Sequence, residues 1–195
     1  MKKFLFAIIA VLFVAAQTSA QAPVRIARLP IIFRSNQPDA NTCIELEVKL
    51  ARAVHIPLNG TLNVAEYIPP ADAAKVLGDI WQSMRTVDKK AKIQDAMRPL
   101  AEEIDADLIV CPILLRYYEN TGGGFSTDEV YLDSQVRAEL IIYDRRDDSL
   151  VDKKVSRMYR DSMSGFGTAS FLSKECFDRL IDQTKIRQTI MTIGK

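Results

Sequence analysis

The stretch of this chain with the clearest potential for chemistry is Ser162–Ser170, which reads Ser-Met-Ser-Gly-Phe-Gly-Thr-Ala-Ser. Gly165 and Gly167 could let backbone amides at the start of a following helix face a phosphate or a carboxylate, helped by Arg157 or Arg160 of the preceding strand. The same residues also fit an ordinary strand-to-helix connection capped by Thr168 or Ser170. The first interpretation predicts an anion nest with the members Gly165, Gly167, Thr168 and Arg160.

Nucleophilic and metal-dependent catalysis find little support in the sequence. The stretch lacks G-x-S-x-G spacing, and His55, the single histidine, precedes it, which is opposite to the order in α/β-hydrolases. One histidine and three scattered cysteines also give no plausible ligand set for zinc. We interpret His55 as a cation at a helix end. The sequence therefore predicts no catalytic residue, no metal and no cofactor, and a protein that is not an enzyme.

The three cysteines leave at least one thiol free or bonded to another chain, because their number is odd. Cys111 lies in the apolar run Leu108–Leu115 and is interpreted as a small buried side chain. Cys43 and Cys176 both fall on predicted helices and are the candidate pair for a disulfide. Sequence alone does not fix their connectivity.

The amino-terminal residues predict export. Lys2 and Lys3 precede an apolar run over Phe4–Ala16, and the small residues Ser19 and Ala20 follow it. This order is that of a secretory signal peptide, here residues 1–20, with cleavage before residue 21. The run is shorter than the roughly 20 apolar residues of a membrane span. We therefore expect residues 21–195 to work in the periplasm or outside the cell, with no transmembrane segment in the mature chain.

Composition indicates a globular domain without a strong charge. Hydrophobic residues make up 48% and charged residues 26% of the chain, as in ordinary folded proteins. Removing Lys2 and Lys3 from the 26 Lys and Arg leaves 24 cations against 25 Asp and Glu. A nearly neutral chain has no overall field that attracts polyphosphate. The sequence thus argues against nucleic acid as a partner.

The first half of the mature chain predicts alternating strands and helices. A strand is expected over Val24–Phe33, interrupted by Pro30, which cannot donate to a ladder. Asn59-Gly60 indicates a tight turn, followed by a strand over Leu62–Ile68. A helix from Pro69-Pro70 to about Met84 comes next, and its Trp81 is expected to seal the core rather than bind a ligand.

The first helix is predicted over Cys43–Val54. Thr42 and Glu45 match a capping box at its start. Its apolar face would consist of Ile44, Val48 and Ala51, with Leu50 and Val54 alongside.

The second half predicts a helix, three strands and a final helix. A helical stripe over Ile93–Ile104 must be kinked or split by Pro99. Strands are expected over Asp107–Tyr118, Val130–Tyr143 and Leu150–Arg160, with a glycine-rich loop over Glu119–Glu129. In the second of these strands Val136, Ala138, Leu140 and Ile142 alternate with Arg137, Glu139, Ile141 and Tyr143. The last helix would bury Leu172, Cys176 and Leu180, and its tail Ile186, Ile190 and Ile193. These elements predict a single α/β (α+β) domain: a mixed sheet of about five strands with helices packed on it, and a long C-terminal hairpin followed by a helix.

Three stretches carry a resemblance to a known group of domains. Arg25–Pro30 is similar to an opening strand that ends in Leu-Pro, Ala106–Val110 to a strand entered through Ala-Asp, and Val136–Val151 to a long hairpin. In element order the chain resembles the periplasmic domain shared by TolB amino-terminal domains, the curli-secretion lipoprotein and the lipoprotein activators of penicillin-binding proteins. The resemblance implies a non-catalytic envelope module that binds protein partners, and it transfers no catalytic residue.

Two functions are therefore expected from the sequence. The first is an exported, non-enzymatic protein of the cell envelope that binds or assembles with an envelope or secreted protein, through the Glu119–Glu129 loop or a sheet edge. The alternative is a binder of a small anion, such as phosphate or a nucleotide, or an enzyme, that uses the Gly165–Thr168 loop.

Overall fold

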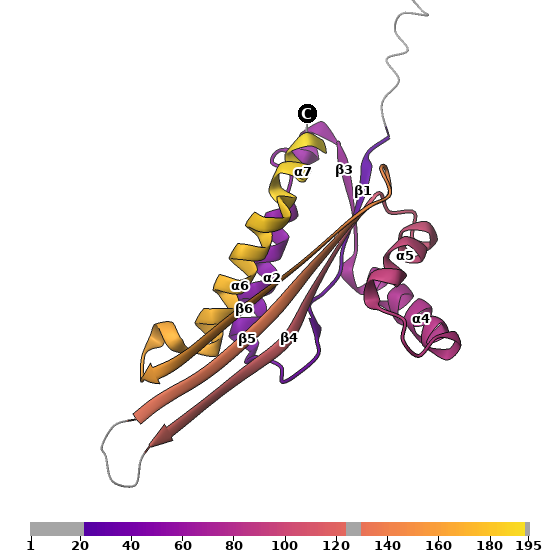
Figure 1. Ribbon diagram of the computed structural model, residues 1–195. Helices are drawn as coiled ribbons and strands as arrows, with labels where there is room; N and C mark the ends of the chain where they lie inside the picture. The colour runs from indigo at the N-terminus through magenta and orange to yellow at the C-terminus, as the bar shows by residue number, and fades with distance from the viewer. Residues whose placement is uncertain (1–21, 124–129, 194–195) are drawn as a thin grey trace, which may run out of the picture.

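The computed structural model describes residues 22–123 and 130–193 (Figure 1). The predicted signal peptide, residues 1–20, lies outside the described residues, as does the part of the predicted loop over residues 124–129.

The centre of the fold is one mixed sheet of six strands. Its order is β3-β1-β4-β5-β6, and β2 pairs with β4 off this path. The strands β1, β2 and β3 run parallel to their neighbours, whereas β4, β5 and β6 form an antiparallel meander. Their bounds are β1 Val24–Arg28, β2 Ile32–Phe33, β3 Ala65–Ile68, β4 Leu108–Gly123, β5 Val130–Asp144 and β6 Ser149–Ser162. The predicted α/β class is confirmed.

The sixth strand comes from the amino-terminal segment, which the sequence predicted as one interrupted strand. The break at Leu29–Ile31 contains Pro30, which has no amide to donate, and it shifts the chain so that β2 pairs with β4 at Ile113 and Leu114. One predicted strand thus becomes two, and both contribute to the sheet.

Helices cover the two faces of the sheet unequally (Figure 1). One face carries α2 (Ala40–Val54), α6 (Ala169–Thr184) and α7 (Ile186–Ile193), and the other carries α4 (Pro70–Val87), the 3-10 turn η1 (Ile93–Ala96) and α5 (Met97–Glu103). Successive residues of β4 point into hydrophobic cores on opposite faces of the sheet. Leu108 and Val110 lie in the first core, beneath α2, α6 and α7, and Ile109 and Cys111 lie in the second core, beneath α4, η1 and α5. The predicted buried stripes of α6 and α7 are confirmed.

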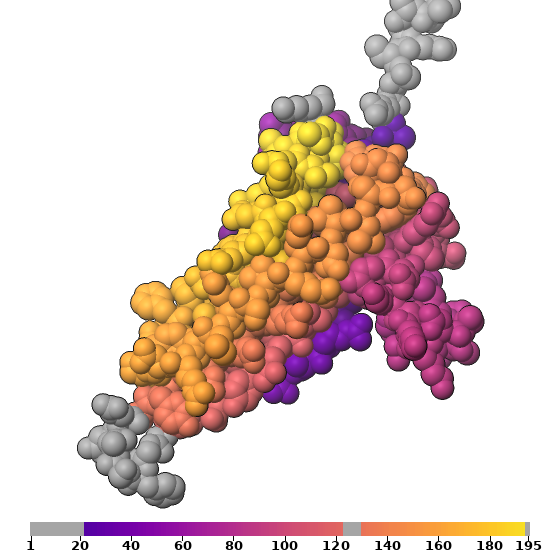
Figure 2. Space-filling view, viewed as in Figure 1, coloured from indigo at the N-terminus to yellow at the C-terminus, as the bar shows by residue number. Residues whose placement is uncertain are grey.

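The three long strands extend beyond the second helical layer. The helices α4 and α5 lie beside only the part of the meander nearest β1, and the far part runs past them (Figures 1 and 2). Because α6 covers the other face along this length, the far half of the meander has one covered and one bare face. We call this bare half the open sheet face, and it carries Tyr118 and Arg116 of β4, Tyr131 and Arg137 of β5, and Met158 and Arg160 of β6.

The predicted start of α2 is wrong, and its predicted apolar face is wrong in part. The N-cap is Asp39, whose Oδ1 accepts a hydrogen bond from the Thr42 amide at 3.0 Å. The helix therefore begins three residues before the predicted capping box. Ile44 is 61% exposed, Val48 is 41% exposed and Ala51 is also exposed. Leu50 and Val54 are buried as predicted, together with Leu46.

Two further predictions differ from the structure. Asn59-Gly60 does not form a tight turn before a strand that begins at Leu62. It lies in the one-turn helix α3 (Asn59–Leu62), and the Asn59 side chain bonds the backbone of Ala65, where β3 begins. The segment Glu119–Gly123 is not loop but the end of β4, because β5 continues to pair with it as far as Val130. Pro99 does separate two helical pieces, since it lies in the first turn of α5 after η1, where its missing amide has no cost.

Candidate functional site

The predicted anion nest already faces a carboxylate of this chain. Gly165 and Gly167 form the 3-10 turn η2 (Gly165–Gly167), and Thr168 is the N-cap of α6. The Ala169 amide donates to Oε2 of Glu119 at 2.5 Å, and the Phe171 amide donates to Oγ1 of Thr168 at 3.2 Å. An external anion would have to displace Glu119. The alternative interpretation, a connection capped by Thr168, describes the local structure.

Arg160 is not brought to this turn. It lies on β6 directly opposite Asp133 of β5, and Asp133 alternates with Leu132 and Ser134, which are buried toward α6. Side chains opposite each other in an antiparallel pair share a face. Arg160 therefore lies on the open sheet face, away from the start of α6, and the nest stays a prediction without its arginine.

The candidate disulfide pair is not joined in the structure, where Cys43, Cys111 and Cys176 are all free. Ion pairs join Glu45 to Lys174 and Lys49 to Asp178, so that α2 and α6 run side by side in the same direction. In that register the residue level with Cys43 is one helical turn before Cys176. Cys176 is buried against β5, and burial raises the pKa of its thiol to about 12.

A cleft at the border of the open sheet face, with which it shares Arg116 and Arg137, gathers four arginines from four segments of the chain. It has a volume of 960 Å³ and lies between η1, the end of α4 and the meander. Arg34 follows β2, Arg85 belongs to α4, and Arg116 and Arg137 belong to β4 and β5. Within the described part of the chain none of the four makes an ion pair with a carboxylate. We call this feature the arginine cleft.

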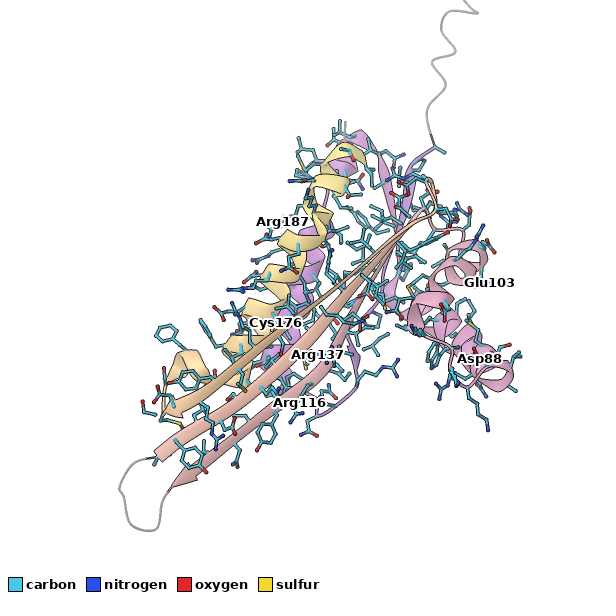
Figure 3. The ribbon with its side chains drawn as sticks, in the orientation of Figure 1. Asp88, Glu103, Arg116, Arg137, Cys176 and Arg187 are labelled. Carbon is cyan, nitrogen blue, oxygen red and sulfur yellow. The ribbon has the colours of Figure 1, made fainter. Side chains whose placement is uncertain are left out.

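Arg116 and Arg137 stand directly opposite each other on neighbouring strands (Figure 3). The register of β4 shifts between Leu114 and Arg116, and this bulge brings the two arginines into the same pair. Like charges in opposite positions of a sheet repel each other. The fold therefore holds two cations at close range without a carboxylate between them.

Trp81 holds the other two arginines. The guanidinium carbon of Arg34 lies 5.7 Å from the centroid of the Trp81 ring, and that of Arg85 lies 5.8 Å away. Contacts of this kind between a cation and an aromatic ring are favourable. Trp81 does pack against the second core, as the sequence predicted, but it also faces the cleft. It positions two cations whose hydrogen-bond donors remain available.

Two of the three carboxylates of the cleft, Glu139 and Asp152, are occupied by other partners. Glu139 is only 4% exposed, and it accepts from Gln94 Nε2 at 2.8 Å and pairs with Lys154 Nζ at 3.0 Å. Burial raises the pKa of Glu139 against the opposing effect of Lys154. Burial also acts to raise the pKa of Asp152, but hydrogen bonds from Gln94 and Lys154 and one shared with Glu139 outweigh it and lower that pKa. Neither carboxylate neutralises the arginines.

An apolar pocket of 300 Å³ adjoins the arginine cleft. The two share Arg34, Trp81 and Ile93, and the pocket continues along α4 between Leu77 and Gly78. Its other lining residues come mainly from the break between β1 and β2 and from α4, namely Leu29, Pro30, Ile32, Phe33 and Ala74.

Sequence reasoning missed the arginine cleft because its members are far apart in the chain. The alternation of Arg137 and Glu139 with apolar residues showed which side of β5 is polar. Only the strand register, including the bulge, places Arg116 opposite Arg137. No group of three or more His, Cys, Asp or Glu that could hold a metal is found among the described residues. No helix in that part of the chain is long and apolar enough to cross a membrane.

No family model matches this sequence, and no curated protein matches it either. Several solved structures are similar in chain course. The hypothetical protein CT253 from Chlamydia trachomatis is 13% identical, with 84% of this chain and 96% of that chain covered and a TM-score of 0.43. Lipoprotein GNA1162 from Neisseria meningitidis is 18% identical, with 82% and 99% covered and a TM-score of 0.36.

PelC from Paraburkholderia phytofirmans, whose structure is a dodecamer, is 14% identical, with 82% of this chain and 86% of that chain covered and a TM-score of 0.41. At these identities and TM-scores the similarities carry no functional argument. The resemblance to the TolB, curli-secretion and penicillin-binding-protein activator domains stays a prediction.

Proposed function

We propose that this chain is an exported, non-enzymatic module of the cell envelope that binds a protein partner through the open sheet face. The observation that supports this function is a bare sheet surface beside a complete core. Met158 is 70% exposed there, Tyr131 is 43% exposed and Tyr118 is 36% exposed. Aromatic residues, methionine and arginine are the types enriched where proteins meet.

The rigidity of the surface favours binding. The strands β4, β5 and β6 pair without interruption except at the bulge near Leu114, and α6 supports them from behind. A surface that is already ordered loses little conformational entropy when a partner docks. β6 is also an edge strand, so a partner could contact its free backbone groups as well.

Capture from an envelope extract tests this proposal. The bait is the purified protein, compared with a Tyr118→Ser/Met158→Glu variant and with Ile44→Ser as the matched control. Ile44 is an exposed apolar residue on α2, behind the sheet. We expect the wild type and Ile44→Ser to recover the same protein, and Tyr118→Ser/Met158→Glu to lose it. Equal recovery by all three, or recovery of nothing by the wild type, would contradict the proposal.

A further inference from the structure

The arginine cleft carries more positive charge than its surroundings balance. Six cationic side chains and three carboxylates line it, although the whole chain has a formal charge of only +1. Lys154 is already paired with Glu139 and Asp152, which leaves Lys92 and the four arginines as the unpaired cations of the described part of the cleft. The positive charge is therefore a result of placement in the fold and not of composition.

The chemistry of these cations indicates which groups they would bind. Guanidinium groups form paired hydrogen bonds with carboxylates and phosphates. Arg34 and Arg85 are held by Trp81, and Arg116 and Arg137 are held in one cross-strand pair, so the donors are in place before a ligand arrives. A bound anion would also relieve the repulsion between Arg116 and Arg137. Four arginines spread over a cleft of 960 Å³ fit a ligand with several anionic groups better than one small ion.

The adjoining apolar pocket indicates that the ligand is a peptide. It opens onto the cleft at Trp81 and Arg34 and offers 300 Å³ to an apolar group. Inorganic phosphates have nothing to place there, whereas a chain segment can present carboxylates and an apolar side chain a few residues apart. We infer that the arginine cleft and this pocket together bind an acidic segment of a protein that also carries one apolar anchor residue.

This inference names the chemistry of the partner and rests on the proposed function for its biological meaning. The binding itself needs only the isolated protein. Trp81 is the single tryptophan of the chain and lies between the cleft and the pocket, so its fluorescence reports on both.

The test titrates the protein with two peptides, Glu-Glu-Leu-Glu-Glu and Glu-Glu-Ser-Glu-Glu, and with inorganic pyrophosphate. We expect the leucine peptide to change the Trp81 fluorescence saturably and to bind more tightly than the serine peptide. The Arg116→Gln/Arg137→Gln variant should bind it about tenfold more weakly or worse, because it loses hydrogen bonds between charged groups. Arg187→Gln on α7, behind the sheet (Figure 3), is the matched control and should bind as the wild type does.

Filling the pocket separates its role from that of the arginines. A Cβ at Gly78 would meet nothing within 4 Å, and Gly78 lines the pocket on α4, so Gly78→Leu should fill the pocket and favour the helix. We expect this variant to bind both peptides equally, at the affinity of the serine peptide.

Three outcomes would overturn the inference: no binding of either peptide, equal binding by the double arginine variant, or pyrophosphate binding that is tighter than that of the leucine peptide. The last outcome would make the cleft a small-anion site. If the peptide titration fails but capture of a protein partner still depends on Tyr118 and Met158, only this inference is removed. If the leucine peptide binds as expected but capture does not depend on Tyr118 and Met158, only the proposed docking face is removed.

Discussion

At the residue scale the most unusual feature is the opposed pair Arg116 and Arg137, which the fold maintains without a carboxylate partner among the described residues. An exposed pair of like charges costs little because water screens it. It nevertheless gives nothing to stability, so its presence is better explained by what the two cations bind. Stability and binding should therefore respond in opposite directions when one charge is reversed.

Arg116→Glu is expected to be more stable than Arg116→Gln by about 0.2–1 kcal/mol, because a glutamate opposite Arg137 forms a favourable cross-strand pair. Both variants lose the contact between Arg116 and the Tyr118 ring, so their difference isolates the charge. Urea unfolding of the two variants measures it. If Arg116→Gln proved as stable as Arg116→Glu or more so, the two arginines would not repel each other as described.

Gly167 has a steric role that the anion-nest prediction did not include. A Cβ at this position would lie 2.3 Å from a ring carbon of Tyr159, whereas a Cβ at Gly165 would meet nothing within 4 Å. We expect Gly167→Ala to lower the free energy of unfolding by about 1–3 kcal/mol through overpacking. Gly165→Ala is the matched control and should remain close to the wild type. Equal stability of the two variants in chemical denaturation would show that the Tyr159 ring moves freely.

At the scale of single elements, α2 shows how a cap and a tertiary contact together choose a helix start. Asp39 caps the helix through Thr42, and the Thr42 hydroxyl is 2.7 Å from the Ser170 hydroxyl at the start of α6. The starts of the two parallel helices are thereby joined. Thr42 is buried by this contact, which leaves Glu45 free to pair with Lys174 on the surface.

Asp39→Ala is expected to lower the thermal midpoint more than Glu45→Ala, because a surface ion pair contributes little. Hydrogen bonds from the side chain and the backbone of Thr42 hold the pKa of Asp39 below its ordinary value of 3.8. A carboxyl group whose pKa is lowered by folding stabilises the folded state at pH values above its pKa in the unfolded chain. This contribution is lost as the pH falls through the pKa of the group in the folded state. The midpoint difference between the wild type and Asp39→Ala should thus be constant near neutrality and shrink below about pH 4. A larger loss for Glu45→Ala would restore the capping box predicted from the sequence.

At the scale of the whole molecule, the two helical layers differ in length, so only part of the sheet is covered on both faces. Near β1 the strands of the meander lie between two cores, and farther out only α2 and α6 support them. The open sheet face and the arginine cleft are both consequences of where α4 and η1 end. The side chains proposed to bind a partner thus lie at the border between the part of the sheet that is covered on both faces and the part that is covered on one face.

Hydrogen exchange should divide β4 at this border. The amides of Ile109, Val110 and Ile113 lie where β4 pairs with β5 on one side and with β1 or β2 on the other, between two cores, whereas residues 117–121 pair with β5 on one side only. We expect slower exchange in the first group than in the second under native conditions. Peptide-level mass spectrometry measures both groups in one experiment. Uniform protection along β4 would mean that the far half is covered by something other than α6, such as a second molecule.

Much of the fold could be predicted from the sequence because local patterns determine it. The period of Leu172, Cys176 and Leu180 gave the buried stripe of α6, and the alternation after Val130 gave the strand β5. Patterns failed where a distant contact changed the result. Glu119–Gly123 is polar and glycine-rich, yet it continues β4 because β5 pairs with it. Ile44 and Val48 have helical spacing, yet both are exposed and Leu46 lies in the core beside the predicted Leu50.

By itself, the sequence determined the α/β class, the buried stripes of the last two helices and the polar side of β5, since each depends on neighbours within a few residues. The tertiary structure alone decided the bulge that opposes Arg116 to Arg137, the position of Trp81 between Arg34 and Arg85, and the Glu119 carboxylate at the start of α6. These contacts join residues from separate elements. Their geometry depends on strand register and on where each helix ends, and no local pattern in the chain encodes either.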